Sequence, residues 1–285
     1  MKLIYSVLIA ICCSSCLLLT ASCSGSKSKG VGEVHATGVF TTDSVGYTDS
    51  VVVGKASGIC SVSVMYPDGK ESVLVDSVRG WIGAQLNVRD KKFNTGEDLV
   101  RFAVKQQLDS TKAELDAIMK DSPDYESQYD NRWNIGPMYE SEKVLTYYSN
   151  SYCYMGGAHG GTLFKAVTFK KDNGESIGWN MFKPSDMDAV KALVKTAVGK
   201  DYFKAENDSL LEECLLVKLN DFPFPAMPPV MVKEGVLFSY QQYEIAPYAA
   251  GMPHCVIPYP VLAPYFSGVA ADIMPKSVDA STVQD

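Results

Sequence analysis

The chain of 285 residues has no cluster of lysine and arginine, and its 26 Lys+Arg against 33 Asp+Glu give a net charge of −7. A protein that holds a phosphate backbone needs a basic patch, so the charge pattern argues against nucleic acid as a partner. Anionic lipid surfaces are disfavoured for the same reason. No internal repeat is visible, and 46% hydrophobic residues indicate an ordinary globular protein with a substantial core.

Residues that carry chemistry are also scarce. The chain has three histidines, at positions 35, 159 and 254. Outside the first 23 residues its cysteines are Cys60, Cys153, Cys214 and Cys255, which are widely spaced and form no Cys-x-x-Cys motif. Disulfides and buried free thiols both remain open for these four. No GxxxxGK[ST] phosphate loop is present.

The N-terminus reads as a secretory signal. Lys2 precedes an apolar run over residues 3–11 that resumes at 17–19, and small residues follow up to Cys23. The segment Leu19-Thr20-Ala21-Ser22-Cys23 resembles the lipobox of bacterial lipoproteins, which implies that residues 1–22 are removed and that Cys23 is lipidated. A plain secretory signal or an uncleaved anchor are the alternatives. Residues 23–44 would then be a tether, and no other segment reaches membrane-spanning length.

The remaining chain predicts two modules and a tail. For residues 45–122 the patterns predict a strand at 57–66, a helix from about 71 with its apolar stripe through Leu86, and a helix capped at Thr95 that ends near Asp121. For residues 123–267 they first predict strands, at 125–139 and 143–154, and a hairpin at 162–169 with its turn at 172–174. Two helices follow, one capped by Ser185 and one at 208–217. A Pro-rich loop at 222–229 then precedes strands at 236–243 and 255–259. Residues 268–285 are expected to be a flexible tail.

Strands and helices occur in separate blocks rather than in regular alternation. This order is typical of an α+β fold with a mainly antiparallel sheet packed by helices, and the two modules are expected to merge into one compact body.

Two loops hold the candidate site residues. Tyr154 leads into Gly156, Gly157 and His159, where the glycines allow backbone conformations closed to other residues. His254 follows a second loop, and together with His159 and Glu244 it could form a metal site of two nitrogens and one carboxylate. Ordinary loop histidines bonded to backbone carbonyls are the favoured alternative.

Two further chemistries are conceivable from the sequence. His159 with Cys255, or His254 with Cys153, could form a nucleophile pair, but the apolar strand context of both cysteines favours inert burial. The aromatic residues of the central strands favour packing across a sheet over sugar stacking or partner binding. They are Trp133, Tyr139, Tyr147, Tyr148, Tyr152 and Tyr154.

The segments around His159 and 235–259 carry a family resemblance. Tyr154-x-Gly156-Gly157-Ala158-His159, then the run from Gly235 through Tyr240-x-x-Tyr243-Glu244-Ile245-Ala246-Pro247-Tyr248 to Gly251, resemble a bacterial envelope domain. That domain is found in lysozyme-responsive anti-sigma factors and ahead of the catalytic domain of certain peptidoglycan deacetylases. Residues 61–67, together with Trp81-Ile82, resemble the companion module that usually precedes this domain. The resemblance implies an α+β fold whose loops can engage lysozyme.

The resemblance implies a binding role for Tyr154, Gly156, Gly157, His159, Tyr243, Glu244, Tyr248 and His254, and it implies no catalytic residue, metal or cofactor. We therefore expect a non-enzymatic, lipid-anchored protein of the cell envelope, on the periplasmic side because no acidic stretch follows Cys23. Its expected partner is a lysozyme-like wall hydrolase or a peptidoglycan fragment. The alternative is a metal-dependent or carbohydrate-active hydrolase that uses His159, His254 and Glu244.

Overall fold

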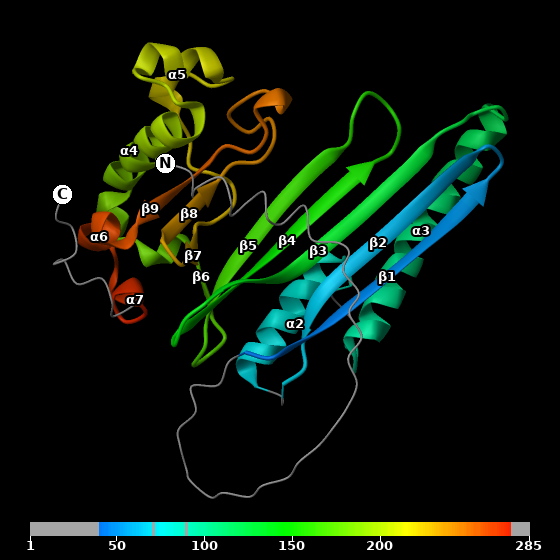
Figure 1. The fold of residues 1–285 in the computed structure, drawn as a ribbon, viewed down its shortest axis with the longest axis horizontal. Coiled ribbons are helices and arrows are strands. Elements are labelled where there is room, and N and C mark those ends of the chain that lie inside the picture. Colours follow the sequence, from blue (N-terminus) through cyan, green and yellow to red (C-terminus); the bar gives the residue numbers. More distant parts are fainter. Residues whose placement is uncertain (1–39, 70–71, 89–90, 275–285) are drawn as a thin grey trace, which may run out of the picture. The chain divides into compact units, whose positions relative to one another are not determined.

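The computed structural model describes residues 40–69, 72–88 and 91–274 (Figure 1). The expected signal peptide, Cys23, His35 and most of the expected tether lie outside these residues, as does the end of the expected tail. In the described residues, strands form a six-stranded sheet and a three-stranded sheet, with helices packed against them. Most strand pairs are antiparallel, which confirms the predicted α+β class.

The six-stranded sheet contains residues of both expected modules. Its strand order is β1-β2-β3-β4-β5-β6, and only β2 and β3 pair in parallel. The strand bounds are β1 Thr42–Val53, β2 Ala56–Pro67, β3 Gln128–Glu140, β4 Val144–Tyr154, β5 Gly161–Lys170 and β6 Ser176–Ile177. The parallel pair requires a long connection between β2 and β3, which two helices provide.

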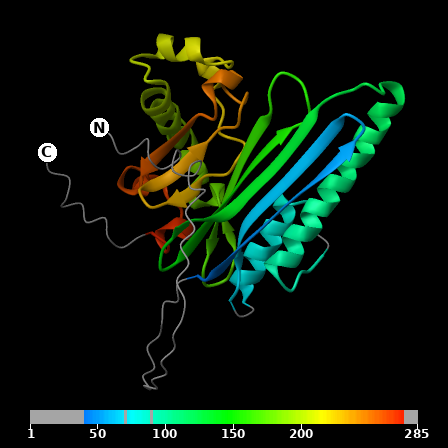
Figure 2. The same cartoon turned by 45° about the vertical axis from the view of Figure 1, so that its right-hand side comes forward.

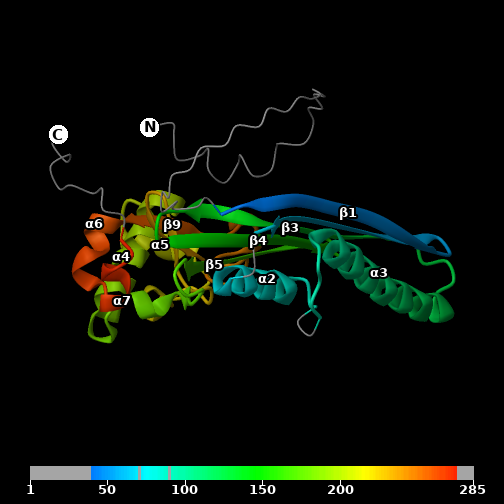
Figure 3. The same ribbon diagram turned by 90° about the horizontal axis from the view of Figure 1, so that it is seen from below.

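Helices α2 (Val73–Gln85) and α3 (Gly96–Asp121) lie along one face of this sheet (Figure 3). Alternate residues of β2 point toward the helices, and Val62 and Val64 are buried against Val78 and Ile82 of α2. Full burial of each such side chain contributes about 1.5–3 kcal/mol, so this face holds the core of the N-terminal half.

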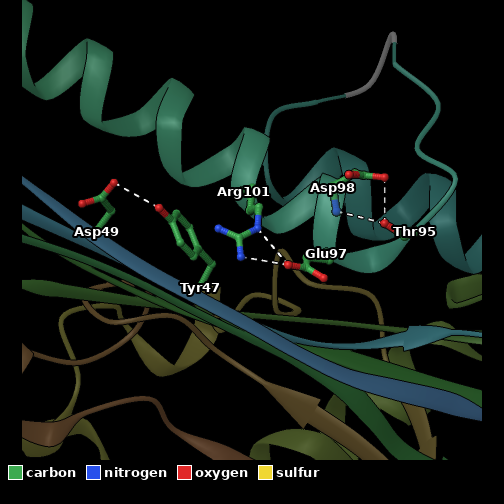
Figure 4. Close-up of polar contacts among 6 residues, drawn as sticks. All are labelled: Tyr47, Asp49, Thr95, Glu97, Asp98 and Arg101. Carbon is green, nitrogen blue, oxygen red and sulfur yellow. Dashed lines mark hydrogen bonds and ion pairs between the residues drawn. The ribbon is translucent and has the colours of Figure 1, made fainter.

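The start of α3 follows the sequence prediction. The Thr95 hydroxyl accepts a hydrogen bond from the Asp98 amide at 3.1 Å, which satisfies a free N–H of the first turn. One turn further on, Arg101 pairs with Glu97 at 2.8 Å, and its guanidinium lies 4.5 Å from the centre of the Tyr47 ring of β1 (Figure 4). These contacts fix the N-terminal turns of α3 over the outer strand of the sheet.

The second sheet packs on the opposite face, against β4 and β5. It consists of β7 (Val230–Val232), β8 (Gly235–Ser239) and β9 (His254–Pro258), which lie beside β5 in Figure 2. Phe164 and Ala166 of β5 are buried against Val230 and Leu237. The hydroxyls of Thr146 and Thr168 are 2.8 Å apart, and both bond the backbone of Met231, so the contact also satisfies buried polar groups.

The rest of the C-terminal part surrounds this second sheet. The helices are α4 Met187–Ala197, η3 Val198–Phe203, α5 Asp208–Cys214, α6 Tyr259–Leu262 and α7 Gly268–Ala271, with short turns η1 Trp179–Met181, η2 Pro184–Asp186, η4 Leu219–Asp221, η5 Tyr248–Ala250 and η6 Ala263–Tyr265. As predicted, Val190 and Val194 face the core from α4. Among the described residues, no helix combines the length and apolar content that crossing a membrane requires.

Several local expectations differ from the structure. Ser185 does not cap α4, because Pro184–Asp186 forms a short turn in which the Ser185 hydroxyl donates to Asp186. The strand expected at 236–243 ends at Ser239, since the following residues form a turn. Strand β1 begins inside the expected tether, at Thr42. Helix α7 lies in the expected tail, where Ala270 and Ile273 are buried and therefore ordered by packing.

Candidate functional site

The hairpin between β4 and β5 forms the first half of the candidate site. Gly156 and Gly157 have φ angles of +83° and +94°, a region that residues with a side chain rarely adopt. A Cβ atom at Gly156 would lie 3.1 Å from the Tyr125 hydroxyl, so the chain is also crowded there. The Tyr154 hydroxyl closes the turn by donating to the Gly157 carbonyl at 3.0 Å. The positive φ angles thus explain why glycine occupies both positions, as the sequence pattern indicated.

His159, at the end of this hairpin, is held in place by hydrogen bonds and by stacking on aromatic rings. Its Nδ1 lies 3.0 Å from the Gly160 carbonyl, which makes Nδ1 the protonated nitrogen. Its Nε2 can then accept from the Tyr243 hydroxyl at 3.4 Å. The imidazole also stacks on Tyr248, with ring centres 3.9 Å apart and an angle of 21°. We call His159, Tyr243 and Tyr248 the ring cluster.

Tyr243 gives the cluster its exposed part. Its side chain is 56% exposed, and its φ angle is +66°, in the left-handed region that costs a residue with a Cβ roughly 1–2 kcal/mol. Its ring centre lies 5.8 Å from that of Tyr248, whose hydroxyl donates to the Gly160 carbonyl at 2.9 Å. An exposed ring on a strained backbone must be held by its neighbours.

The side chains of Gln241, Gln242 and Glu244 hold Tyr243 in this conformation. The Glu244 carboxylate accepts from the Gln241 amide at 2.7 Å and from the Ala226 amide at 2.6 Å. The Gln241 side chain bonds both the N–H and the carbonyl of Phe164, at 3.1 and 2.7 Å, and Gln242 accepts from Thr162. The two glutamines therefore bind the edge of β5 where β6 does not pair with it.

Gln241 and Gln242 were not among the site residues predicted from the sequence. They occupy the two unspecified positions of the Tyr240-x-x-Tyr243 pattern. An adjacent pair of amide side chains inside an otherwise aromatic and apolar segment was the available signal, because such residues need partners when they are partly buried.

His254 and Glu244 do not join His159, so these three residues do not form the metal site that was the less favoured alternative from the sequence. The Nδ1 of His254 lies 3.0 Å from the Met252 carbonyl, and its ring packs edge-on to Tyr202 with centres 5.2 Å apart. Both oxygens of Glu244 are bound to backbone amides. Within the described part of the chain, no three His, Cys, Asp or Glu side chains are grouped to hold a metal ion. The favoured alternative, loop histidines bonded to carbonyls, describes both residues.

The four described cysteines are free thiols. Burial raises the pKa of Cys60 to about 12 and that of Cys255 to about 12, so both stay neutral at physiological pH. Cys153 is exposed, which corrects the expectation that it is buried, because it lies near the end of β4. Partial desolvation of the thiol, with the nearby carboxylates of Glu114 and Asp130, nevertheless raises the pKa of Cys153. A raised pKa is the opposite of what an activated nucleophile needs.

The strand aromatics mostly pack across the sheet, as predicted. Tyr147 is fully buried, its hydroxyl donates to the Met65 carbonyl at 2.9 Å, and burial raises its pKa. Tyr148 stacks on Phe164 with ring centres 6.5 Å apart. Tyr152 and Tyr154 lie at the end of β4 that leads to the ring cluster and are half-buried.

The comparisons with known proteins agree with this architecture. Residues 180–260 match a family described as "Protein of unknown function (DUF3298)", so the chain carries a domain of this family in its C-terminal half. This confirms the resemblance predicted from the sequence, at the level of a domain of unknown function. The matched range contains Tyr243, Glu244, Tyr248 and His254, whereas the His159 hairpin precedes it.

Two solved structures share the fold. A DUF3298 family member from Bacteroides fragilis has a TM-score of 0.69 at 19% identity, covering 81% of this chain and 95% of its own. A DUF3298 family protein from Pseudomonas aeruginosa has a TM-score of 0.57 at 14% identity, covering 81% of this chain and 96% of its own. No curated protein matches the chain significantly.

Proposed function

We propose that the chain is a non-enzymatic, lipid-anchored binding protein of the cell envelope whose ring cluster contacts a basic wall-cleaving hydrolase such as lysozyme. One observation carries this proposal: the Tyr243 ring is 56% exposed on a left-handed backbone that Gln241, Gln242 and Glu244 fix in place. A strained residue that the surroundings hold rigidly is a common feature of recognition sites. Exposed tyrosines are also frequent anchors of protein interfaces.

Two further features support a contact with a cationic protein. The net charge of −7 speeds the encounter with a basic partner, although charge contributes more to association rate than to affinity. An apolar side chain is also exposed in the same hairpin as His159, at Met155, which is 44% exposed. Tyrosine rings with neighbouring apolar groups form the kind of surface that a protein partner buries.

The same geometry gives no support to the hydrolase alternative. His159, His254 and Glu244 each bond a different part of the backbone, so they do not aim at one point where a substrate could react. We therefore assign structural and contact roles, and no catalytic role, to these three residues.

The test is inhibition of lysozyme acting on a suspension of purified cell wall. We expect the purified chain to slow clearing of the suspension with a one-to-one stoichiometry, and Tyr243→Ala to weaken inhibition by about 30-fold, which corresponds to a hot-spot residue worth about 2 kcal/mol. Leu216→Ala is the matched control, because Leu216 is also an exposed apolar residue, at 60%, on a different segment. Unchanged lysozyme rates at micromolar protein would refute the proposal, and so would unaided clearing of the wall by the chain.

A further inference from the structure

One residue on the outer edge of β5 is left without a backbone partner. Phe164 directs its N–H and its carbonyl away from β4, because the Gln241 side chain bonds both. In an antiparallel ladder these directions repeat at every second residue, so Ala166 and Thr168 turn the same groups to that edge. Thr168 pairs there with Ile177 of β6. Ala166 lies between the two contacts, and its N–H and carbonyl bond no group among the described residues.

A cavity opens at this position. It has a volume of about 330 Å³ and reaches from β5 across β6 to η1 and to Pro228 of the Pro-rich loop. Both Ala166 and Val167 line it. Since successive side chains of a strand point to opposite faces, a cavity that contacts both residues lies at the strand edge. Ala166 is only 8% exposed, and unpaired backbone groups are costly in such a place. The cavity therefore offers a ligand two backbone groups that need partners.

The lining of the cavity indicates a neutral ligand. None of the described residues that form it carries a charge, and its polar side chains are Ser176 and Asn180. The Asn180 carboxamide oxygen accepts from the Gly178 amide at 2.9 Å, so the NH₂ group of Asn180 remains a donor for a ligand. Trp179 also lines the cavity, and its indole N–H has no acceptor in the described part of the chain. An anion would lose its water here without gaining a cation.

The neighbouring contact on β5 shows which chemical group fits. The Gln241 carboxamide accepts from the N–H of Phe164 at 3.1 Å and donates to its carbonyl at 2.7 Å. A primary carboxamide can do both, because one of its N–H groups lies on the same side as its oxygen, whereas a trans secondary amide directs the two groups to opposite sides. An extended peptide along β5 does not fit, since Gln241 and β6 occupy the edge on either side of Ala166.

We propose that the cavity at Ala166 binds a primary carboxamide, either the side chain of a glutamine in a peptide or a small neutral amide. The carboxamide oxygen accepts from the Ala166 N–H, and its NH₂ group donates to the Ala166 carbonyl, as Gln241 does at Phe164. The site shares no residue with the ring cluster, so the inference does not rest on the proposed binding of a hydrolase.

The test is an NMR titration of the full chain in detergent that follows the Ala166 amide and Trp179 indole signals. Propionamide is the probe, and we expect it to shift both signals with a millimolar dissociation constant, as is usual for so small a ligand. Propionate lacks the donor, and N-methylpropionamide holds its N–H on the wrong side. Each leaves one Ala166 group unpaired, so both should bind about tenfold more weakly or not at all.

A fourth compound distinguishes the two sources of the carboxamide. Acetyl-glutamine N-methylamide carries the group on a peptide backbone. Tighter binding than that of propionamide would support a glutamine of a peptide as the natural ligand, and equal binding would support a small amide.

Ser176→Tyr should abolish the shifts, because it places a large side chain at the lining of the cavity. Ser63→Tyr is the matched control, since Ser63 is also an exposed strand serine but lies on β2. Hydrogen exchange of the wild-type chain needs no variant. The Ala166 amide should exchange about tenfold or more faster than those of Lys165 and Val167, which face β4, and propionamide should slow it.

Three results would each overturn the inference. The first is the absence of shifts at about 100 mM propionamide, well above the affinity expected of such a ligand. The second is equal binding of propionamide, propionate and N-methylpropionamide, because the Ala166 pairing would then not select the ligand. The third is an Ala166 amide that is as protected from exchange as its neighbours before any ligand is added, because its N–H would already be paired.

Discussion

Strand β4 joins two hairpins, and the chain uses them differently. At its start, Glu140 accepts from the Phe40 amide at 2.9 Å and from the Lys171 ammonium at 2.6 Å, and Phe40 packs edge-on to Tyr147. The Glu140 and Lys171 side chains are only 27% and 18% exposed. At its other end, the positive φ of Tyr243 and the exposed ring cluster cost stability rather than add to it.

The contrast separates a well-packed region from an exposed one. The described chain begins at Phe40, at the Glu140 end, and the eleven residues of β4 put the ring cluster about 36 Å away along the strand. The well-packed end and the ring cluster therefore lie at opposite ends of the same strand. The following experiments test whether the packed and the exposed regions behave independently.

The largest effect is expected for Cys23→Ala. Without the thiol no acyl chains can be added, and since each buried CH₂ contributes about 0.8 kcal/mol, membrane association should be lost completely. Fractionation of cells and the mass of the purified protein measure this. Lysozyme inhibition by the purified variant should equal that of the wild type. A variant that stays in the membrane fraction would show that another segment anchors the chain.

Thiol reactivity should follow the same contrast between packed and open regions. Cys153, near the ring-cluster end of β4, should react with iodoacetamide at pH 8, whereas Cys60, buried against the helices with a pKa of about 12, should react more than a hundredfold more slowly. Mass spectrometry of the labelled peptides measures both rates. Equal labelling of the two cysteines in the folded protein would contradict the packing described for β2.

The buried thiols also predict a pH dependence. Because their pKa values rise from 9.0 to about 12 on folding, the neutral thiol is the form that the fold favours. Their contribution to the free energy of unfolding is complete below pH 9 and is lost as the pH rises from about 9 to 12. Cys60→Ala should reduce this alkaline loss in denaturant titrations at pH 8 and pH 10. An unchanged difference between the two pH values would contradict the prediction.

A smaller effect is expected for Glu140→Ala. The substitution leaves the Lys171 ammonium and the Phe40 amide without this acceptor, and we expect a loss of about 1–2 kcal/mol in the free energy of unfolding. Urea titration measures it. Lysozyme inhibition by the folded variant should be unchanged, because the ring cluster lies at the other end of β4. Weaker inhibition would mean that the two ends are coupled.

The sequence predicted elements whose signal is local. The apolar stripe and the capping residue of α3 lie within a few positions of each other, and the structure confirms both. The sequence did not predict β1. As the outer strand of the sheet, β1 has one free edge and much of its surface in water, so its residues alternate little in polarity. Nor did it predict β7, three buried residues directly after the Pro-rich loop.

The candidate site shows the same limit. Glycine spacing identified Gly156 and His159, the family resemblance added Tyr243, and the structure brings His159 and Tyr243 together across 84 positions in the chain. Whether His254 joined them depended on how the loops pack, which local patterns do not encode. The clamps of Gln241 and Gln242 on β5 were missed for that reason.

The most direct test of the central claim compares Tyr243→Gly with Tyr243→Ala. Both remove the ring, but glycine accepts the positive φ without strain. We predict that Tyr243→Gly is about 1 kcal/mol more stable to urea than Tyr243→Ala, and that neither variant inhibits lysozyme like the wild type. Equal stability of the two variants, or full inhibition by either, would contradict the proposal that a strained backbone exposes the Tyr243 ring to a protein partner.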